Sequence, residues 1–393
     1  MSRKTLWLLT LLLLGFMACN NNNEEDNPTI PNPSPNPGEN PSITTETVLT
    51  GLQHPWGMAF IDDNTWLVTE RNGDLLLVEN GTPTALNHGL NVAFGGQGGL
   101  LDIKVAPDFD QSGNVYMTYS KDGNNGTSTT ALVRFTVTNG TIENMEELFE
   151  ASPYNGGRLH FGSRIAFDND GHVFVSLGDR FAYNAASAII NPSTSFPQDL
   201  RTHWGKVVRL NLDGSVPTDN PFVNQSNALS EVFSYGHRNP QGIAFDLSRN
   251  ELFVNEHGAQ GGDEINLINA GNNYGWPIIS YGRDYNGQSI GEGSSKAGLE
   301  QPLRFYNPSV APSSHLIYTG DVYPEWEGNH FMTSLANRTL FRLSWDGSNM
   351  EQEEILYRNR LGRIRSIAQS PDGHLYLLID DDDGEVVKLV VGE

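Results

Sequence analysis

The chain repeats one pattern of hydrophobic and polar positions. A short apolar segment is followed by a polar turn and then by a second segment rich in Val, Leu, Tyr and Phe. The pattern occurs at residues 55–70, 98–120, 163–179, 239–258 and 363–381, with a weaker copy at 326–347. Branched and aromatic residues favour strands, while Asp, Asn and Gly clusters favour tight turns. Each copy therefore predicts a β-hairpin.

The number of copies and their spacing predict the architecture. Six hairpins recur at irregular intervals, so loops of different length connect similar units. The 41 glycines and 21 prolines among 393 residues favour many short strands over long helices. Radial repetition of four-stranded units leaves only short, protected sheet edges. We predict an all-β chain folded as a six-bladed β-propeller, because a pair of sandwiches could also use short strands but would not explain the phrase AF or AP followed by x-D that recurs in the copies.

Charge narrows the classes of partner. The formal net charge is -23 at pH 7, from 47 acidic and 24 basic residues. Proteins that bind nucleic acid neutralise phosphates with Lys and Arg, so no nucleic-acid partner is expected. The acidic balance suits an extracellular protein, and Ca²⁺ is a candidate ligand because it prefers carboxylate and carbonyl oxygens.

The first 43 residues differ in composition from the rest. Residues 1–18 combine two early basic residues with an apolar run, and the only cysteine, Cys19, follows directly. This order is typical of a bacterial lipoprotein signal peptide, cleaved before Cys19, which is then lipidated. Residues 19–43 predict a disordered Pro- and Asn-rich tether, and residues 44–393 the folded domain. We expect a lipid anchor in the bacterial cell envelope, facing the periplasm or the cell surface; ordinary secretion is the alternative.

Five glycine- or proline-framed stretches carry candidate site residues. They contain Gln97, His160, Asp179, the pair Arg238 and Asn239, and the pair Arg363 and Arg365. A single such residue is more often structural than functional, but these belong to different hairpin units and lie at strand or loop ends. Loops from every blade of a propeller converge at one mouth of the central channel, so we expect the five stretches to meet there.

Two further patterns point to ligands. Arg363 and Arg365 are two residues apart in a predicted strand, so their side chains leave the same face. An anionic ligand gripped bidentately would relieve their repulsion, whereas a solvated strand face is the plain alternative. Residues 255–277 offer glycine-rich carbonyls beside Asp263 and Glu264, which suits Ca²⁺ without matching an EF-hand. The scattered histidines do not predict a zinc site.

Four longer motifs resemble one known family. They are GKVVRLNLDGSVPTDNPF, YGHRNPQGIAF, GGDEINLINAGNNYGWP and SVAPSSHLIY, and the likeness runs from about Gly51 to the C-terminus. They are similar to the soluble PQQ-dependent aldose sugar dehydrogenases, the glucose/sorbosone dehydrogenase group. This resemblance implies a six-bladed propeller that holds PQQ and Ca²⁺ at one mouth and oxidises the anomeric hydroxyl of an aldose to a lactone. Hydride passes from sugar C1 to PQQ, and electrons go on to an external acceptor.

The resemblance also implies residue roles. His160 is the general base, Asp179 holds it and stabilises its charged form, and Arg238 stabilises negative charge on the quinone. The expected cofactor and substrate contacts are Gln97, Arg238, Asn239, Ser309, Arg363 and Arg365. The expected calcium ligands are the carbonyls of Gly258 and Ala259 on the cofactor side, with Glu264 and Tyr274 at a further structural calcium.

The chain departs from the family pattern at four places. Ala336 stands where members often carry a lysine that pairs with PQQ, and Arg338 is a candidate substitute. Leu159 replaces an acidic residue before the base, and Ser309 replaces a threonine while keeping a hydroxyl. The loop at 180–198 differs from the expected sugar-binding loop.

Two other functions fit a propeller. One is a non-catalytic domain that binds a glycan or a protein at the same mouth after losing PQQ. The other is a Ca²⁺-dependent lactonase-type hydrolase, although paired arginines suit an anionic cofactor better than a neutral lactone. Uptake of PQQ and oxidation of an aldose separate the dehydrogenase from both.

Overall fold

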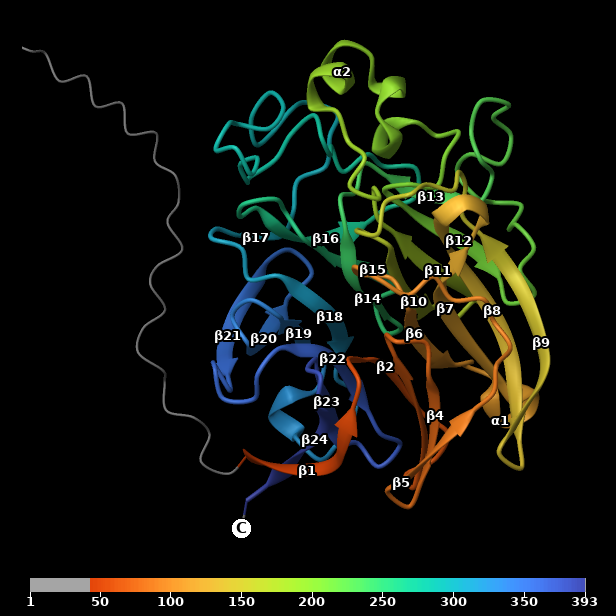
Figure 1. Ribbon diagram of the computed structural model, residues 1–393. Helices are drawn as coiled ribbons and strands as arrows, with labels where there is room; N and C mark the ends of the chain where they lie inside the picture. Colours follow the sequence, from red (N-terminus) through yellow and green to blue (C-terminus); the bar gives the residue numbers. More distant parts are fainter. Residues whose placement is uncertain (1–42, 393) are drawn as a thin grey trace, which may run out of the picture.

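Six antiparallel sheets of four strands make up this computed structural model, which describes residues 43–392. Figure 1 shows the sheets around a ring, with their first strands gathered at the centre. The first three blades are β2 Pro55–Phe60, β3 Thr65–Glu70, β4 Leu75–Glu79 and β5 Thr82–Leu86; β6 Leu100–Val105, β7 Asn114–Asp122, β8 Ser128–Thr138 and β9 Thr141–Glu150; and β10 Gly162–Phe167, β11 His172–Leu177, β12 Lys206–Asn211 and β13 Val232–Tyr235.

The remaining blades complete the ring. They are β14 Pro240–Asp246, β15 Glu251–Glu256, β16 Asp263–Ile268 and β17 Arg304–Tyr306; β18 Pro312–Ile317, β19 His330–Ser334, β20 Thr339–Trp345 and β21 Met350–Leu356; and β22 Ile364–Gln369, β23 Leu375–Ile379 and β24 Gly384–Val391 with β1 Ile43–Leu52. β1 pairs with β24, so Ile43 lies opposite Val391 and the two ends of the domain close the last blade. The six-bladed prediction is confirmed.

Helices are short and lie in the connections. They are α1 Phe109–Ser112 and α2 Ala185–Ile190, with the 3-10 segments η1 Asn124–Gly126, η2 Pro192–Thr194, η3 Phe196–Gln198 and η4 Pro324–Trp326. None of the helices in residues 43–392 has the length and apolar character needed to cross a membrane. The predicted signal peptide at 1–18, the lipidation site Cys19 and nearly all of the tether at 19–43 lie outside the described residues, and the first described strand, β1, begins at Ile43.

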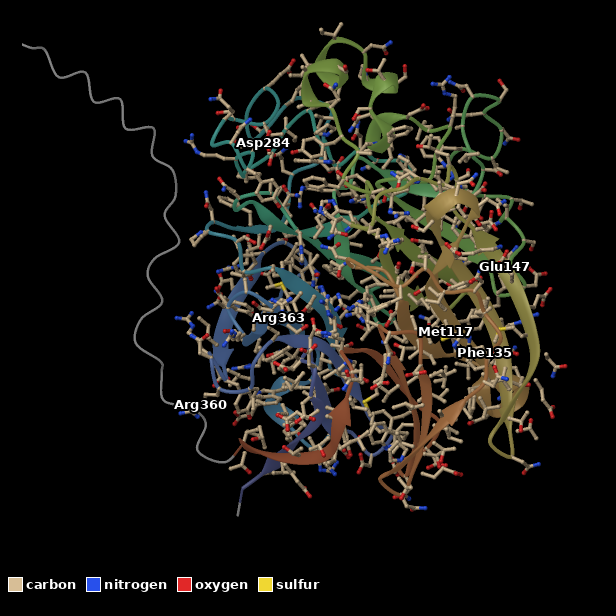
Figure 2. All side chains as sticks on the ribbon, viewed as in Figure 1. Met117, Phe135, Glu147, Asp284, Arg360 and Arg363 are labelled. Carbon is tan, nitrogen blue, oxygen red and sulfur yellow. The ribbon has the colours of Figure 1, made fainter. Side chains whose placement is uncertain are left out.

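Hydrophobic clusters hold neighbouring blades together. One cluster fills each of the six interfaces between sheets, because the strands bury side chains on both faces. Between the first and second blades, for example, Leu67 packs with Met117 and Phe135, all fully buried. Figure 2 labels Met117 and Phe135 inside the second blade and Glu147 on its outermost strand, β9. The hydrophobic core therefore lies between neighbouring blades all around the ring, and it does not occupy the central channel.

The antiparallel register places the candidate residues at one mouth. In each blade the start of the first strand pairs with the end of the second, as Gly162 pairs with Leu177 and Ile364 with Ile379. Residues that precede a first strand therefore lie beside residues that follow a second strand. His160, Arg238, Asn239 and Arg363 precede first strands, and Asp179 follows a second strand, so all share this mouth.

Candidate active site

A cavity of about 380 Å³ opens at this mouth. Its size is within the range of small-molecule and cofactor sites. Three of the predicted residues, Gln97, Arg363 and Arg365, line it together with residues that the sequence did not single out: His54, Trp56, Arg71, Leu101, Phe161, Gly162, Gln241, His257, Ala311, Leu335, Asp380, Asp381 and Asp382. Figure 2 labels Arg363 near the inner strands β18 and β22.

His160 and Asp179 form a buried pair beside the cavity. His160 Nδ1 lies 2.6 Å from Asp179 Oδ1, and both side chains are almost fully buried. The second carboxylate oxygen, Oδ2, accepts a hydrogen bond of 2.8 Å from Trp276 Nε1. Asp179 Oδ1 also accepts from the backbone of Phe181 at 2.8 Å. These contacts fix the ring of His160 with Nδ1 toward the carboxylate and leave Nε2 as the nitrogen for chemistry, since none of the described residues hydrogen-bonds it.

The backbone around His160 is held in an uncommon conformation. Its φ is 51°, in the left-handed region, and its N–H donates to Gln97 Oε1 at 2.7 Å. Gly178 permits this arrangement, because a Cβ there would lie 2.2 Å from the carbonyl oxygen of His160. Left-handed non-glycine residues held by their surroundings are typical of functional sites. Gln97 therefore connects the cavity to the candidate base.

Burial sets the proton affinity of His160. Desolvation lowers its pKa below 6.5, and this effect outweighs the raising effect of the neighbouring Asp179. The positive charges of Arg238 and Arg180 lower the pKa further. The imidazole is therefore neutral near pH 7, which is the state that a general base requires.

Arg238 and Asn239 are buried with incomplete hydrogen bonding. Arg238 Nη1 donates to the carbonyls of His257, at 3.0 Å, and of Gly258, while its Nε has no partner. Asn239 is fully buried and its Nδ2 also has no partner. An unpaired buried donor is costly, so such groups call for an explanation such as an absent ligand. Asn239 accepts hydrogen bonds from two residues that line the cavity, from Gln241 Nε2 at its Oδ1 and from the backbone of His257 at its carbonyl.

Arg363 and Arg365 share a carboxylate that the sequence argument did not anticipate. Arg365 Nη2 lies 2.8 Å and Arg363 Nη2 3.7 Å from Asp380 Oδ2. Burial opposes ionisation of Asp380, but Arg365, Arg363 and His54 hold its pKa at about 2. An external anion is therefore not needed to relieve the repulsion of the two guanidiniums. Arg365 Nε remains buried and unpaired, so one donor is still available to a ligand.

Two family positions differ in their surroundings from what was expected. Ser309 is directed to Asp263, with its Oγ 2.7 Å from Oδ2, and it does not line the cavity. The lysine position is Ala336, which is exposed. Arg338 is also exposed and lies near enough to Arg363 to lower the pKa of its guanidinium. Arg338 can therefore supply positive charge at this edge of the mouth.

The expected calcium positions fall into two groups. The Gly258 carbonyl already accepts from Arg238, so one lone pair is committed. Glu264 and Tyr274 line a space of about 10 Å³ together with Glu256, and Gly258 from the first group borders the same space, which is enough for one water or ion. Burial and the nearby Glu256 carboxylate raise the pKa of Glu264 to about 8.

A cation fits the Glu264 and Tyr274 positions better than the Gly258 and Ala259 positions. The hydroxyl of Tyr274 is committed to Leu267 and Asn269, which leaves its main-chain carbonyl as the candidate ligand. Within residues 43–392 no group of three His, Cys, Asp or Glu side chains is arranged for a metal, so backbone oxygens would have to complete either site.

The sequence alone did not predict several residues of the site. Trp276, which positions Asp179, lies inside a quoted motif but carried no distinguishing signal. Asp380 opens a run of four aspartates, a pattern that reads equally well as a solvated turn. His257 is half-buried, its Nε2–H donates to the carbonyl oxygen of Pro312, and desolvation lowers its pKa to about 3, so it is neutral where it borders the cavity. Only the fold brings these residues to the same mouth.

Comparisons with known proteins place the chain in a family. The glucose/sorbosone dehydrogenase family model matches residues 52–388. The chain is 37% identical to the aldose sugar dehydrogenase YliI of Escherichia coli over 355 residues, covering 88% of this chain and 93% of that protein.

Solved structures agree with this match. The apo crystal structure of the soluble E. coli aldose sugar dehydrogenase aligns with a TM-score of 0.83 and 36% identity, covering 89% of this chain and all of that one. The PQQ-bound aldose sugar dehydrogenase of Streptomyces coelicolor aligns with a TM-score of 0.72 and 26% identity, covering 91% and 99%. The chain thus belongs to the glucose/sorbosone dehydrogenase family of six-bladed β-propellers.

Proposed function

We propose that the protein oxidises the anomeric hydroxyl of an aldose to a lactone, with PQQ and Ca²⁺ as cofactors. The observation that carries this proposal is the buried His160–Asp179–Trp276 arrangement beside the cavity, together with unpaired buried donors on Arg365, which lines the cavity, and on Arg238 and Asn239. PQQ, when bound, supplies a two-electron acceptor for the hydride of the sugar. Its carboxylates and quinone oxygens are acceptors that suit this donor set. The similar S. coelicolor enzyme is PQQ-bound.

The residues of the chain have distinct tasks in this proposal. His160 Nε2 takes the proton of the anomeric hydroxyl, and Asp179 stabilises the imidazolium that forms. Arg238, Asn239, Arg363 and Arg365 hold the cofactor, and Arg238 lies close enough to His160 to favour its neutral state before reaction. Gln97 fixes the backbone of the base at the substrate side.

Calcium and location complete the proposal. Ca²⁺ bound by Gly258 and Ala259 carbonyls would act as a Lewis acid toward the cofactor, and a second ion at Glu264 and Tyr274 would be structural. Lipidation of Cys19 would hold the enzyme in the bacterial cell envelope, from which electrons pass to an external acceptor. The alternative of a non-catalytic glycan- or protein-binding propeller stands if PQQ does not bind.

The decisive experiment is reconstitution of the purified domain with PQQ in the presence and absence of Ca²⁺. We expect saturable, Ca²⁺-dependent binding followed by absorbance, a quinone spectrum that bleaches on addition of an aldose, and reduction of an artificial acceptor. PQQ binding without turnover of any aldose would reject the dehydrogenase. Glycan binding without PQQ uptake would favour the alternative.

Arg363→Ala should weaken PQQ binding without unfolding the domain. The side chain is 46% exposed and sits 3.7 Å from Asp380, so its removal leaves no buried charge unpaired. Loss of one charge-assisted hydrogen bond at a half-exposed site should raise the PQQ concentration for half-saturation about tenfold. Arg358→Ala, on the exposed segment before it, is the matched control. Unchanged half-saturation in the Arg363 variant would remove this residue from the cofactor site.

Calcium should stabilise the domain through the Glu264 site. The buried Glu256 and the half-buried Glu264 carboxylates border one small space and repel each other, and a divalent cation would relieve this repulsion. We expect Ca²⁺ to raise the Tm in a concentration-dependent way and EDTA to reverse the rise. Glu264→Gln should abolish most of the shift, whereas Glu143→Gln, an exposed residue on β9, should leave it unchanged. A full shift in Glu264→Gln would place the ion elsewhere.

A further inference from the structure

An exposed aromatic wall stands directly beside the candidate base. The ring of Phe181 packs edge-on against His160, with centroids 5.1 Å apart, yet 42% of Phe181 is exposed. Tyr183 and Tyr285 continue the wall, with their rings 6.0 and 6.1 Å from Phe181, and Tyr285 is 55% exposed. Large exposed aromatic side chains that adjoin one another at a site are typical of ligand recognition.

The loop that presents Phe181 is held against its conformational preference. Arg180 and Phe181 both have left-handed φ angles, 56° and 57°, although neither is glycine. Arg180 is buried and donates to Leu159 O, Ser128 O and Gly157 O, and its guanidinium lies 3.7 Å from the centre of the Phe161 ring. This many contacts over-determine the loop, and strain of this kind is kept where it serves a site. The fold therefore fixes an exposed phenyl ring next to the base.

Polar groups are interleaved with the aromatic wall. Tyr285 Oη accepts from Arg238 Nη2 at 3.2 Å, and Tyr183 Oη donates to Asp284 Oδ1 at 3.2 Å. Figure 2 labels Asp284 in the loop that follows β16. A surface that alternates rings with hydroxyl, carboxylate and guanidinium groups matches a pyranose, whose C–H bonds form an apolar face and whose hydroxyls lie at the rim.

We infer that Phe181, with Tyr183 and Tyr285, binds the C–H face of the sugar ring and sets substrate specificity; this inference rests on the proposed function. Equatorially substituted pyranoses such as glucose and xylose present a flat face of axial C–H bonds. An axial hydroxyl on the stacked face, as at C2 of mannose, would be buried against the phenyl ring without a partner. Phe181 is thus a substrate-contacting residue that favours gluco- and xylo-configured aldoses over manno-configured ones.

The test compares Phe181→Ala, Phe181→Tyr and wild-type enzyme reconstituted with PQQ and Ca²⁺. In Phe181→Ala we expect KM for glucose and xylose to rise about threefold to tenfold with kcat changed less than twofold, and the preference over mannose to shrink. Phe181→Tyr keeps the ring and should restore KM. Leu247→Ala, an exposed apolar residue in the β14–β15 hairpin, is the control. If wild type is active and Phe181→Ala has unchanged KM values, the inference about the aromatic wall fails and the proposed function stands.

A non-reacting ligand separates this inference from the proposed function. Methyl β-D-glucopyranoside has no free anomeric hydroxyl, so it can bind without being oxidised. Its binding can be followed by tryptophan fluorescence, because the ring of Trp276 lies 4.7 Å from that of Tyr183. We expect Phe181→Ala to bind the glycoside more weakly than wild type does, by the same factor as the rise in KM. If wild type oxidises no aldose, the dehydrogenase proposal fails, and ring-dependent glycoside binding would still support the sugar wall. No glycoside binding by wild type would overturn it.

Discussion

His160→Ala should abolish most turnover of the reconstituted enzyme while leaving cofactor binding largely intact. His160 Nδ1 is occupied by Asp179 at 2.6 Å, so the side chain has one nitrogen, Nε2, for proton transfer. A positioned general base contributes about 10²–10⁴-fold to rate. We expect kcat to fall within that range, with half-saturation by PQQ unchanged within about twofold.

A second histidine in the same blade provides the control. His172 also pairs with a carboxylate, Asp168, at 2.7 Å, but it lies in the β10–β11 hairpin at the other end of the strands. His172→Ala removes the same side chain and the same kind of pair, and it should leave kcat unchanged. If His160→Ala kept more than a tenth of the wild-type kcat, the assignment of the base would be wrong.

The acid limb of the pH profile gives an independent measure of the same group. Because desolvation and the charges of Arg238 and Arg180 lower the pKa of His160, the neutral base is retained below the ordinary value of 6.5. Activity should therefore be lost only as the pH falls below 6.5 and the imidazole becomes protonated. An acid limb of kcat/KM centred at or above pH 6.5 would contradict this environment for the base.

Much of the architecture followed from local sequence chemistry, because a propeller is built from repeated hairpins. Turn residues and strand residues alternate within each copy, so the six blades could be predicted without long-range information. The pairing of β1 with β24 could not, because Ile43 and Val391 are joined only by closure of the ring.

The site divides in a similar way. Residues in framed motifs, such as His160 and Arg363, were found because glycines and prolines mark special backbone. Partners that satisfy them from other blades were missed: Asp380 for the arginines and Trp276 for Asp179. The wall residue Phe181 gave no periodic signal either, since its exposure depends on a left-handed backbone held by Arg180.

Arg164→Met should produce the largest loss of stability of any single change at the mouth. Arg164 lies on β10 and is buried, and its side chain contacts the first strand of every other blade. It binds Asp102 Oδ1 at 2.9 Å, the carbonyls of Gln241, Ser313 and Arg365, and Ser366 Oγ, and it lies 4.0 Å from the centre of the Trp56 ring.

Burial makes this residue costly to remove. Desolvation lowers the pKa of Arg164 to about 10, which still leaves the guanidinium charged at neutral pH. Removing one partner of a buried ion pair leaves the other charge buried without a partner, which costs about 3–5 kcal/mol of stability. We expect a loss of that size in the free energy of unfolding, measured as a lower midpoint of urea denaturation with an unchanged slope. Arg249→Ala, whose Nε is 3.8 Å from Asp246 at an exposed hairpin, should change stability by less than about 0.5 kcal/mol.

A double variant decides whether the ion pair or the packing is responsible. In Asp102→Asn combined with Arg164→Met, no carboxylate is left unpaired, so the loss should be smaller than the sum of the two single losses by at least about 1 kcal/mol. If the two single losses simply added, Asp102 and Arg164 would contribute to stability independently and the ion pair would have no interaction energy. Because Arg164 also holds the carbonyl of Arg365 at 2.8 Å, PQQ binding should weaken together with stability. In this fold the same side chain closes the ring and supports the floor of the candidate site.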